Sequence, residues 1–202
     1  MIQTEIRDIP MEFETGPEVF SPSGIDLGTL SMLSLFHPKQ SDKVLDLGCG
    51  YGVVGIFTGK LIGSEHVVMC DLSEDAIDLS RVNAVRNSVP DIRIIKSNGL
   101  DEIPDYDFTY ILSNPPYHED FSVPKSFIEN GYKKLVTGGK MMMVTKRLDW
   151  YKNKLSSVFG GVKIVELNGY HIFIAEKRIR KSLIEHKNKN QLSKKLRRKY
   201  NI

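Results

Sequence analysis

A glycine-rich stretch at residues 46–55, Asp-Leu-Gly-Cys-Gly-Tyr-Gly-Val-Val-Gly, constrains the fold of this chain more than any other feature. It follows a short apolar run at 44–47 that predicts a strand, and it leads into a helix expected over 52–62. Glycines in such a turn let the backbone approach a ligand closely, and the N-terminus of the following helix adds N–H donors. The stretch therefore predicts a strand–loop–helix unit with a ligand at the carboxyl end of the strand.

Predicted strands and helices alternate along the rest of the chain. Apolar runs and helical periodicity predict further strands at 66–70, 92–96, 108–113 and 141–144, and helices at 73–87, 124–136 and 149–159. This alternation is typical of βαβ units, which build a parallel sheet covered by helices on both faces.

Turn residues set the expected ends of these elements. Ser73 is a good N-cap for its helix, and Gly138-Gly139 is expected to close the helix at 124–136. Two runs separated by Asn168-Gly169, at 162–167 and 170–175, predict an antiparallel hairpin. We therefore predict an α/β fold: a Rossmann-like, mostly parallel seven-stranded sheet with helices on both faces and a C-terminal antiparallel hairpin.

The length of 202 residues suits a single domain. The charges are unevenly distributed along the chain. Residues 1–40 are expected to form a less regular N-terminal segment of that domain, which includes a small hairpin, and residues 41–177 its core. Residues 178–202 are expected to form a basic tail, because 177–202 hold 11 Lys or Arg against one acid, Glu185. Such tails commonly bind nucleic acid; the alternative is a solubilising tail without a partner.

Composition excludes several classes of protein. No apolar run approaches the roughly 18 residues that span a membrane, and the N-terminus shows no signal-peptide pattern. Cys49 and Cys70 are expected to be reduced and packed, as in a cytoplasmic protein, and their spacing predicts no metal site.

The turn Asn114-Pro115-Pro116-Tyr117 follows the strand predicted at 108–113. Both prolines have a fixed φ, and each restricts the residue before it, so the turn is stiff. It can aim the Asn114 side-chain oxygen and the Pro115 carbonyl into one cleft, where two acceptors would hold the hydrogens of a planar NH₂ group. Tyr117 adds an aromatic face for stacking a flat group. The alternative is an ordinary Pro-Pro turn.

Asp71 ends the strand after the glycine loop, where a carboxylate can accept hydrogen bonds from ribose hydroxyls. The loop also satisfies the dinucleotide fingerprint at Gly50, Gly52 and Gly55, so an NAD-dependent oxidoreductase is a further alternative. Asp46 argues against it, because a carboxylate before the first glycine suits a cationic amine better than a pyrophosphate. The Asn-Pro-Pro-Tyr turn also has no use in hydride transfer.

Together these motifs resemble those of class I S-adenosylmethionine (SAM) methyltransferases that act on exocyclic or amide nitrogens. Segments at 20–21, 26–29, 138–147, 159–160 and 169–170 extend the resemblance to the "methyltransferase small" family over residues 18–177. It is closest to the catalytic domain of the RsmC-like ribosomal-RNA guanine-N2 methyltransferases.

The resemblance implies a SAM pocket and names the residues that would line it. The cofactor-binding residues implied are Asp46, Gly48, Gly50, Gly52, Asp71 and Asn98. Asn98 stands where the family usually has an Asp that contacts the adenine amino group. Its amide oxygen can still accept one hydrogen bond, but it lacks the charge.

The resemblance assigns the acceptor side to the Asn-Pro-Pro-Tyr turn, with Asn114 and Pro115 holding the target NH₂, Pro116 stiffening the turn and Tyr117 stacking the base. The expected activity is SAM-dependent N-methylation of an exocyclic amino group of a nucleobase in RNA, guanine N2 of ribosomal RNA. RNA would bind through the cleft and the basic tail. Two alternatives stay open: a protein glutamine N5-methyltransferase, and a non-catalytic RNA-binding protein with a degenerate SAM pocket, which Asn98 suggests.

Overall fold

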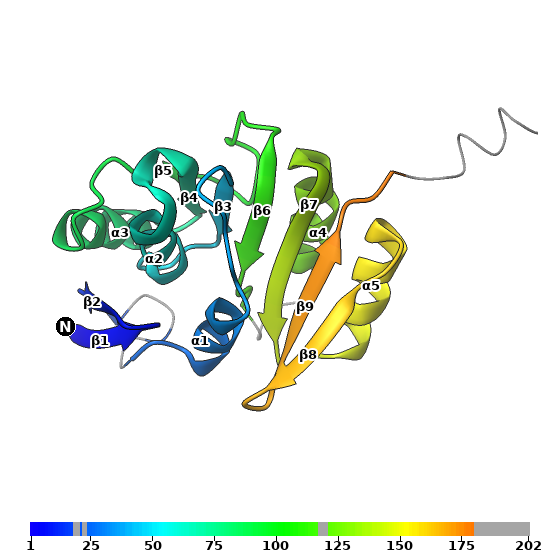
Figure 1. Cartoon of the computed structure of the whole chain (residues 1–202), viewed down its shortest axis with the longest axis horizontal. Helices are drawn as coiled ribbons and strands as arrows, with labels where there is room; N and C mark the ends of the chain where they lie inside the picture. Colours follow the sequence, from blue (N-terminus) through cyan, green and yellow to red (C-terminus); the bar gives the residue numbers. More distant parts are fainter. Residues whose placement is uncertain (18–20, 22–23, 117–120, 180–202) are drawn as a thin grey trace, which may run out of the picture.

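The computed structural model describes residues 1–17, 21, 24–116 and 121–179 (Figure 1). Within them, seven strands form one sheet in the order β5-β4-β3-β6-β7-β9-β8. The strands are β3 (Val44–Leu47), β4 (Val67–Asp71), β5 (Arg93–Lys96), β6 (Phe108–Ser113), β7 (Leu135–Thr145), β8 (Lys163–Leu167) and β9 (Tyr170–Glu176). The first five are parallel, and β9 is antiparallel to both β7 and β8. The predicted mostly parallel sheet with a C-terminal antiparallel hairpin is confirmed.

Helices cover both faces of the sheet (Figure 1). They are α1 (Leu27–Ser34), α2 (Val53–Ile62), α3 (Glu74–Arg86), α4 (Ser122–Lys134) and α5 (Asp149–Phe159), with a short 3₁₀ turn at Ser64–His66. Side chains of a strand alternate between its two faces. In β4, Val67 and Met69 join the apolar cluster that contains α1, α2 and α3, whereas Val68 and Cys70 join the cluster that contains α4 and α5.

The glycine pair of β7 corrects one prediction. Helix α4 ends at Lys134, and Gly138 and Gly139 lie inside β7 rather than at a helix end. The β6–β7 register shifts between Phe108 and Tyr110, and Gly138 has a φ of +85°. A Cβ at Gly139 would lie 3.0 Å from the carbonyl oxygen of Phe108. The pair therefore permits a bulge between close backbones, a role that the sequence pattern does not distinguish from a helix stop.

The N-terminal hairpin is present as β1 (Ile2–Ile6) and β2 (Ile9–Phe13), a separate two-stranded sheet. Two asparagines, Asn83 in α3 and Asn87 at its C-cap, bind the backbone of β2 and of the residue that follows it. Asn87 accepts from the Glu12 backbone N–H at 3.1 Å and donates to the Glu12 carbonyl at 2.7 Å, and Asn83 does the same for Glu14 at 2.7 and 2.8 Å. Side-chain amides thus take the place of a neighbouring strand and fix the chain at Glu12 and Glu14 against the end of α3.

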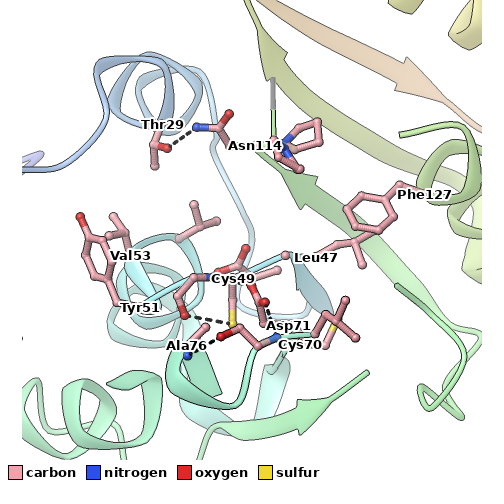
Figure 2. A pocket seen from close by; sticks show the side chains of 18 of the residues that line it. Thr29, Leu47, Cys49, Tyr51, Val53, Cys70, Asp71, Ala76, Asn114 and Phe127 are labelled. Carbon is pink, nitrogen blue, oxygen red and sulfur yellow. Dashed lines mark hydrogen bonds between the residues drawn. The ribbon is translucent and has the colours of Figure 1, made fainter. Parts of the chain in front are cut away.

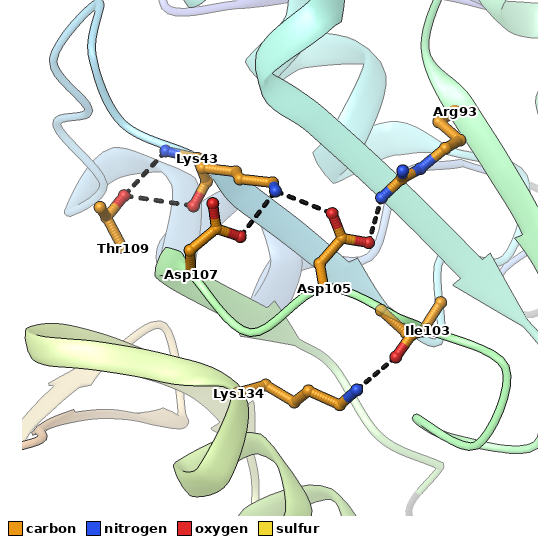
Figure 3. Close-up of polar contacts among 7 residues, drawn as sticks. All are labelled: Lys43, Arg93, Ile103, Asp105, Asp107, Thr109 and Lys134. Atoms are coloured by element: carbon orange, nitrogen blue, oxygen red, sulfur yellow. Dashed lines mark hydrogen bonds and ion pairs between the residues drawn. The ribbon is translucent and has the colours of Figure 1, made fainter.

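At the amino-terminal edge of the sheet, an ion cluster anchors the connection between β5 and β6 (Figure 3). Lys43 precedes β3, and its ammonium lies 2.7 Å from Asp105 and 2.6 Å from Asp107. Asp105 also binds Arg93 at the start of β5. Lys134, at the end of α4, donates to the Ile103 carbonyl. These contacts fix the connection at the edge opposite to the loops that carry the predicted site.

Candidate active site

A cavity of about 540 Å³ opens at the carboxyl ends of β3, β4 and β6 (Figure 2). This is the edge at which open parallel sheets bind their ligands. Eight of the residues predicted for the site line it: Asp46, Gly48, Gly50, Asp71, Asn98, Asn114, Pro115 and Pro116. Gly52 is not among the lining residues, and Tyr117 lies outside the described part of the chain. The volume suits a nucleotide-sized ligand.

The glycine loop is folded around the end of β4. The backbone N–H groups of Gly48 and Cys49 both donate to the Cys70 carbonyl at 2.9 Å. Gly48 and Gly50 have φ values of +75° and +55°, which residues other than glycine rarely adopt. The loop therefore turns back on the sheet, and at Gly48 and Gly50 it presents bare backbone to the cavity.

Asp71 is held in place from two sides. One carboxylate oxygen accepts from the Gly50 N–H at 2.9 Å, and the other accepts from the Ser73 N–H at 3.0 Å (Figure 2). Ser73 is the N-cap of α3, as predicted, and its hydroxyl accepts from the Ala76 N–H. Each carboxylate oxygen can accept a second hydrogen bond. The cavity wall thus offers a fixed anionic acceptor, which is what the hydroxyls of a ribose require.

Gly52 serves packing at the start of α2. It has a φ of +97° at the N-cap position. A Cβ there would lie 2.7 Å from Cδ1 of Ile56 and 2.9 Å from Cε of Met69. Gly52 therefore lets the loop pack closely on Ile56 and Met69, and it does not itself line the cavity.

Asp46 is a buried carboxyl at the base of the cavity, with 2% of its surface exposed. One of its oxygens accepts from the Gly55 N–H in α2 at 2.8 Å. Burial raises the pKa of Asp46 to about 7, and the nearby charge of Asp71 adds to the rise, against the opposing effect of the Gly55 bond. A bound cation would reverse this effect, because an opposite charge favours the ionised carboxyl.

Both cysteines are free thiols and buried, as predicted. Burial raises the pKa of Cys70 to about 12 and that of Cys49 well above its usual value. Both side chains therefore stay neutral beside the cavity and act as packing groups.

On the opposite wall, Asn114 is held by residues from α1. Its Nδ2 donates to Oδ2 of Asp26 at 2.9 Å. It also donates to Oγ1 of Thr29 at 2.9 Å (Figure 2). Asp26 also accepts from the hydroxyl of Tyr170 in β9 at 2.9 Å. The amide nitrogen is therefore directed at α1, and the side-chain oxygen is the acceptor end of the group.

Sequence reasoning named Asp26 and Tyr170 only as parts of family segments and gave neither a role. Their separations from Asn114 are 88 residues for Asp26 and 56 residues for Tyr170. No local pattern links residues so far apart. The only signal was Asp26 standing three residues before Thr29, the spacing of a helix N-cap. Helix α1 was not predicted, but Asp26 does cap it by accepting from the Thr29 N–H at 2.9 Å.

The chain is similar to known methyltransferases over most of its length. The family model described as "Methyltransferase small domain" matches residues 10–174. Ribosomal RNA small subunit methyltransferase C of Cronobacter sakazakii is 31% identical over 163 residues, which cover 79% of this chain and 47% of that protein. The same-named protein of Serratia proteamaculans is 32% identical and is covered to 46%. The chain thus spans about half the length of these curated relatives.

Solved structures show the same fold. A 16S rRNA N2 methyltransferase (RsmC) from T. thermophilus, in complex with AdoMet and guanosine, superposes with a TM-score of 0.81 at 22% identity, covering 88% of this chain and 50% of that one. A methyltransferase from Pyrococcus furiosus gives a TM-score of 0.70 at 21% identity, covering 84% of this chain and 90% of that one.

Proposed function

Because this chain belongs to the methyltransferase small domain family, we propose that it transfers a methyl group from SAM to an exocyclic amino group of a nucleobase in RNA, guanine N2 of ribosomal RNA. One observation carries the proposal: a fixed amide, that of Asn114, and a fixed carboxylate, that of Asp71, line the same cavity. The names of its relatives, ribosomal RNA small subunit methyltransferase C, support the choice of ribosomal RNA.

The cofactor would lie along the glycine loop. Asp71 would accept from the ribose hydroxyls, and Asp46 would face the cationic amino group beside the backbone of Gly48 and Gly50. Asn98, which lines the cavity, would accept from the adenine amino group. Gly52 would contribute indirectly, through the conformation of the loop.

The acceptor amine would be held by the oxygen of Asn114 and the carbonyl of Pro115, in the turn that Pro116 stiffens. SAM would supply a methyl group on a sulfonium sulfur, which the nitrogen lone pair would accept while the electrons of the carbon–sulfur bond go to sulfur. The products are neutral S-adenosylhomocysteine and an N-methylated ammonium, which loses a proton to water. Positioning is the main contribution of the protein. Stacking by Tyr117 stays a prediction.

The raised pKa of Asp46 predicts pH-dependent cofactor binding. Below a pH of about 7, Asp46 of the free protein carries a proton. The positively charged amino group of a bound cofactor favours the ionised carboxylate, so binding releases that proton. Affinity for S-adenosylhomocysteine should fall by up to about tenfold per pH unit below this value, the limit for release of one proton. Calorimetry between pH 5 and 8 measures it. Asp46→Asn should bind S-adenosylhomocysteine more weakly, with an affinity that does not change with pH. The same pH dependence in this variant as in the native protein would contradict the role of Asp46.

Cationic side chains flank the acceptor side of the cavity. Lys146 and Arg147 directly follow β7, whose Met143 pairs with Ser113 of β6, so they leave the sheet at the edge that carries Asn114. The Lys146 ammonium lies 4.9 Å from the ring centre of Tyr170, the residue bonded to Asp26. Both cations are exposed, and neither forms an ion pair with another described residue. They suit the phosphates of an RNA strand whose base enters the cavity.

Replacing both Lys146 and Arg147 with Ala should weaken RNA binding and flatten its dependence on salt. The slope of log affinity against log salt should become shallower by about 0.7, the single-strand value, for every phosphate that the variant no longer binds. The exposed Lys60, at the far end of α2, and Lys163, in the edge strand β8, provide a control pair that should leave the slope unchanged. If both double variants gave the same slope of log affinity against log salt, Lys146 and Arg147 would not contact the RNA.

We assign the basic tail to the same partner. Residues 180–202 lie outside the described part of the chain, so this assignment rests on their charge. A chain ending at residue 177 provides a further arm of the salt titration, with ten Lys or Arg removed. A reduced slope supports an RNA anchor, and an unchanged slope indicates a tail without this partner. Within the described residues no helix is long and apolar enough to cross a membrane. RNA as the substrate would place the protein in the cytoplasm.

Labelled SAM tests the function directly. Total RNA from cells that lack the protein is incubated with the protein and digested to nucleosides; label in N2-methylguanosine is the expected result. Label in another amino-methylated nucleoside keeps the chemistry and changes the base. Label only in protein supports the glutamine methyltransferase, and cofactor binding without transfer to RNA or protein supports the non-catalytic RNA-binding protein.

A further inference from the structure

Three segments far apart in the sequence meet at the carboxylate of Asp26. Its Oδ2 accepts from the Thr29 N–H and from Nδ2 of Asn114, both at 2.9 Å, and its Oδ1 accepts from the hydroxyl of Tyr170 at 2.9 Å. The donors come from α1, from the loop after β6 and from β9. Asp26 also lines the cavity.

These contacts determine which way the Asn114 amide points. The two ends of an asparagine amide are nearly identical in shape and differ in that one donates and the other accepts. A carboxylate only accepts, so the NH₂ end faces Asp26, and Thr29 provides a second acceptor at 2.9 Å. The reversed amide would place its oxygen against the Asp26 carboxylate. The oxygen is therefore directed away from α1.

We infer that Asp26 is a positioning residue for the transfer reaction: it keeps the oxygen of the Asn114 amide, rather than its nitrogen, directed at the acceptor amine. This inference rests on the proposed function and adds a cause of specificity to it. With the amide reversed, an NH₂ group would be presented to the substrate, and two sets of donors would face each other. Asp26 thus selects substrates that donate at this point.

The surroundings keep Asp26 itself in place. A Cβ at Gly28 would lie 2.5 Å from Cδ1 of Tyr170 and 2.8 Å from Oδ2 of Asp26, so only glycine leaves room for the Tyr170–Asp26 contact. Burial raises the pKa of Tyr170, and its bond to Asp26 raises it further, so the phenol stays protonated and donates. Because Asp26 also caps α1, its carboxylate has little freedom to turn away.

A reciprocal exchange tests the inference. Asp26→Asn should lower kcat by about 10-fold to 100-fold, the effect of a misplaced reacting group, while affinity for S-adenosylhomocysteine changes by less than about threefold. Asn114→Asp should lower kcat further than Asp26→Asn does, because two carboxylates then face each other. The double variant exchanges donor and acceptor between these two side chains and still presents an oxygen to the amine, although the NH₂ group at position 26 no longer accepts from the Thr29 N–H. It should recover at least about tenfold over Asn114→Asp.

Two comparisons separate positioning from stability. Tyr170→Phe removes the bond to Oδ1 and leaves the bond between Asp26 and Asn114, so it should lower the melting temperature and keep most of kcat. A double variant no more active than Asn114→Asp would overturn the inference, as would losses of kcat that follow the melting temperature across all four variants.

An NMR readout keeps the inference independent of the substrate. The side-chain NH₂ signals of Asn114, assigned by their absence in Asn114→Ala, should exchange slowly with water in the native protein and rapidly in Asp26→Asn. Slow exchange in the native protein, rapid exchange in Asp26→Asn and no methylation of any RNA would together refute the proposed function, while supporting the role of Asp26 in orienting the Asn114 amide. Equal exchange rates in the two proteins would refute the positioning.

Discussion

Asn114→Ala should reduce methyl transfer by on the order of 100-fold or more, with affinity for S-adenosylhomocysteine within about twofold of the native protein. The side chain faces the acceptor part of the cavity, and its nitrogen is bound to Asp26 and Thr29. Its removal takes away one of two proposed acceptors for the target amine and leaves the glycine loop untouched. Single-turnover rates at saturating SAM measure the transfer step, and calorimetry measures the affinity.

Asn130→Ala is the matched control, because Asn130 lies on the outer part of α4 and bonds only to Ser126 and Lys133 among the described residues. It should keep the native rate. An Asn114→Ala protein that retained most of its single-turnover rate would rule out amine capture by this loop.

Asp71→Ala should have the opposite profile. Affinity for SAM and S-adenosylhomocysteine should fall by about 10-fold to 100-fold, the range for hydrogen bonds to a charged group. The substitution also removes the bonds to the Gly50 and Ser73 N–H groups, which leaves the loop less fixed. At saturating SAM the single-turnover rate should recover to within about threefold of the native rate, because the acceptor contacts are on another wall.

Asp78→Ala provides the comparison for Asp71→Ala. Asp78 is an exposed carboxylate on α3, paired with Arg81 at 3.1 Å, and exposed pairs contribute little. This variant should bind S-adenosylhomocysteine as the native protein does. Native affinity in Asp71→Ala would show that the ribose is held elsewhere.

The sequence predicted the sheet well because each parallel strand contains a short apolar run, and turn signals stand beside several of these runs. The run at 108–113 became β6 without change, and Asn168-Gly169 became the turn of the β8–β9 hairpin. The glycine loop was placed correctly for the same reason, since its chemistry is local: close backbone turns and positive φ values need glycine within a few residues.

The acceptor wall could be predicted only in part. The sequence predicted that the side-chain oxygen of Asn114 would face a cleft, but not the contacts that hold the amide in that orientation. Those contacts come from Asp26 and Thr29, which reach Asn114 because α1 packs near β7 and β9. Helix α1 itself has a weak pattern, because a glycine, a threonine and a serine occupy buried positions in it. Contacts made by tertiary packing leave no periodic trace in the sequence.

The position of β9 has a consequence for how the protein is made. This strand is the last of the sheet along the chain, yet it pairs with β7 in the interior of the sheet, while β8 occupies the edge. A ribosome synthesises the glycine loop and the Asn-Pro-Pro turn well before Tyr170 emerges to meet Asp26. The cofactor half of the cavity can therefore form on the nascent chain, whereas the acceptor half is completed only when the final strand inserts.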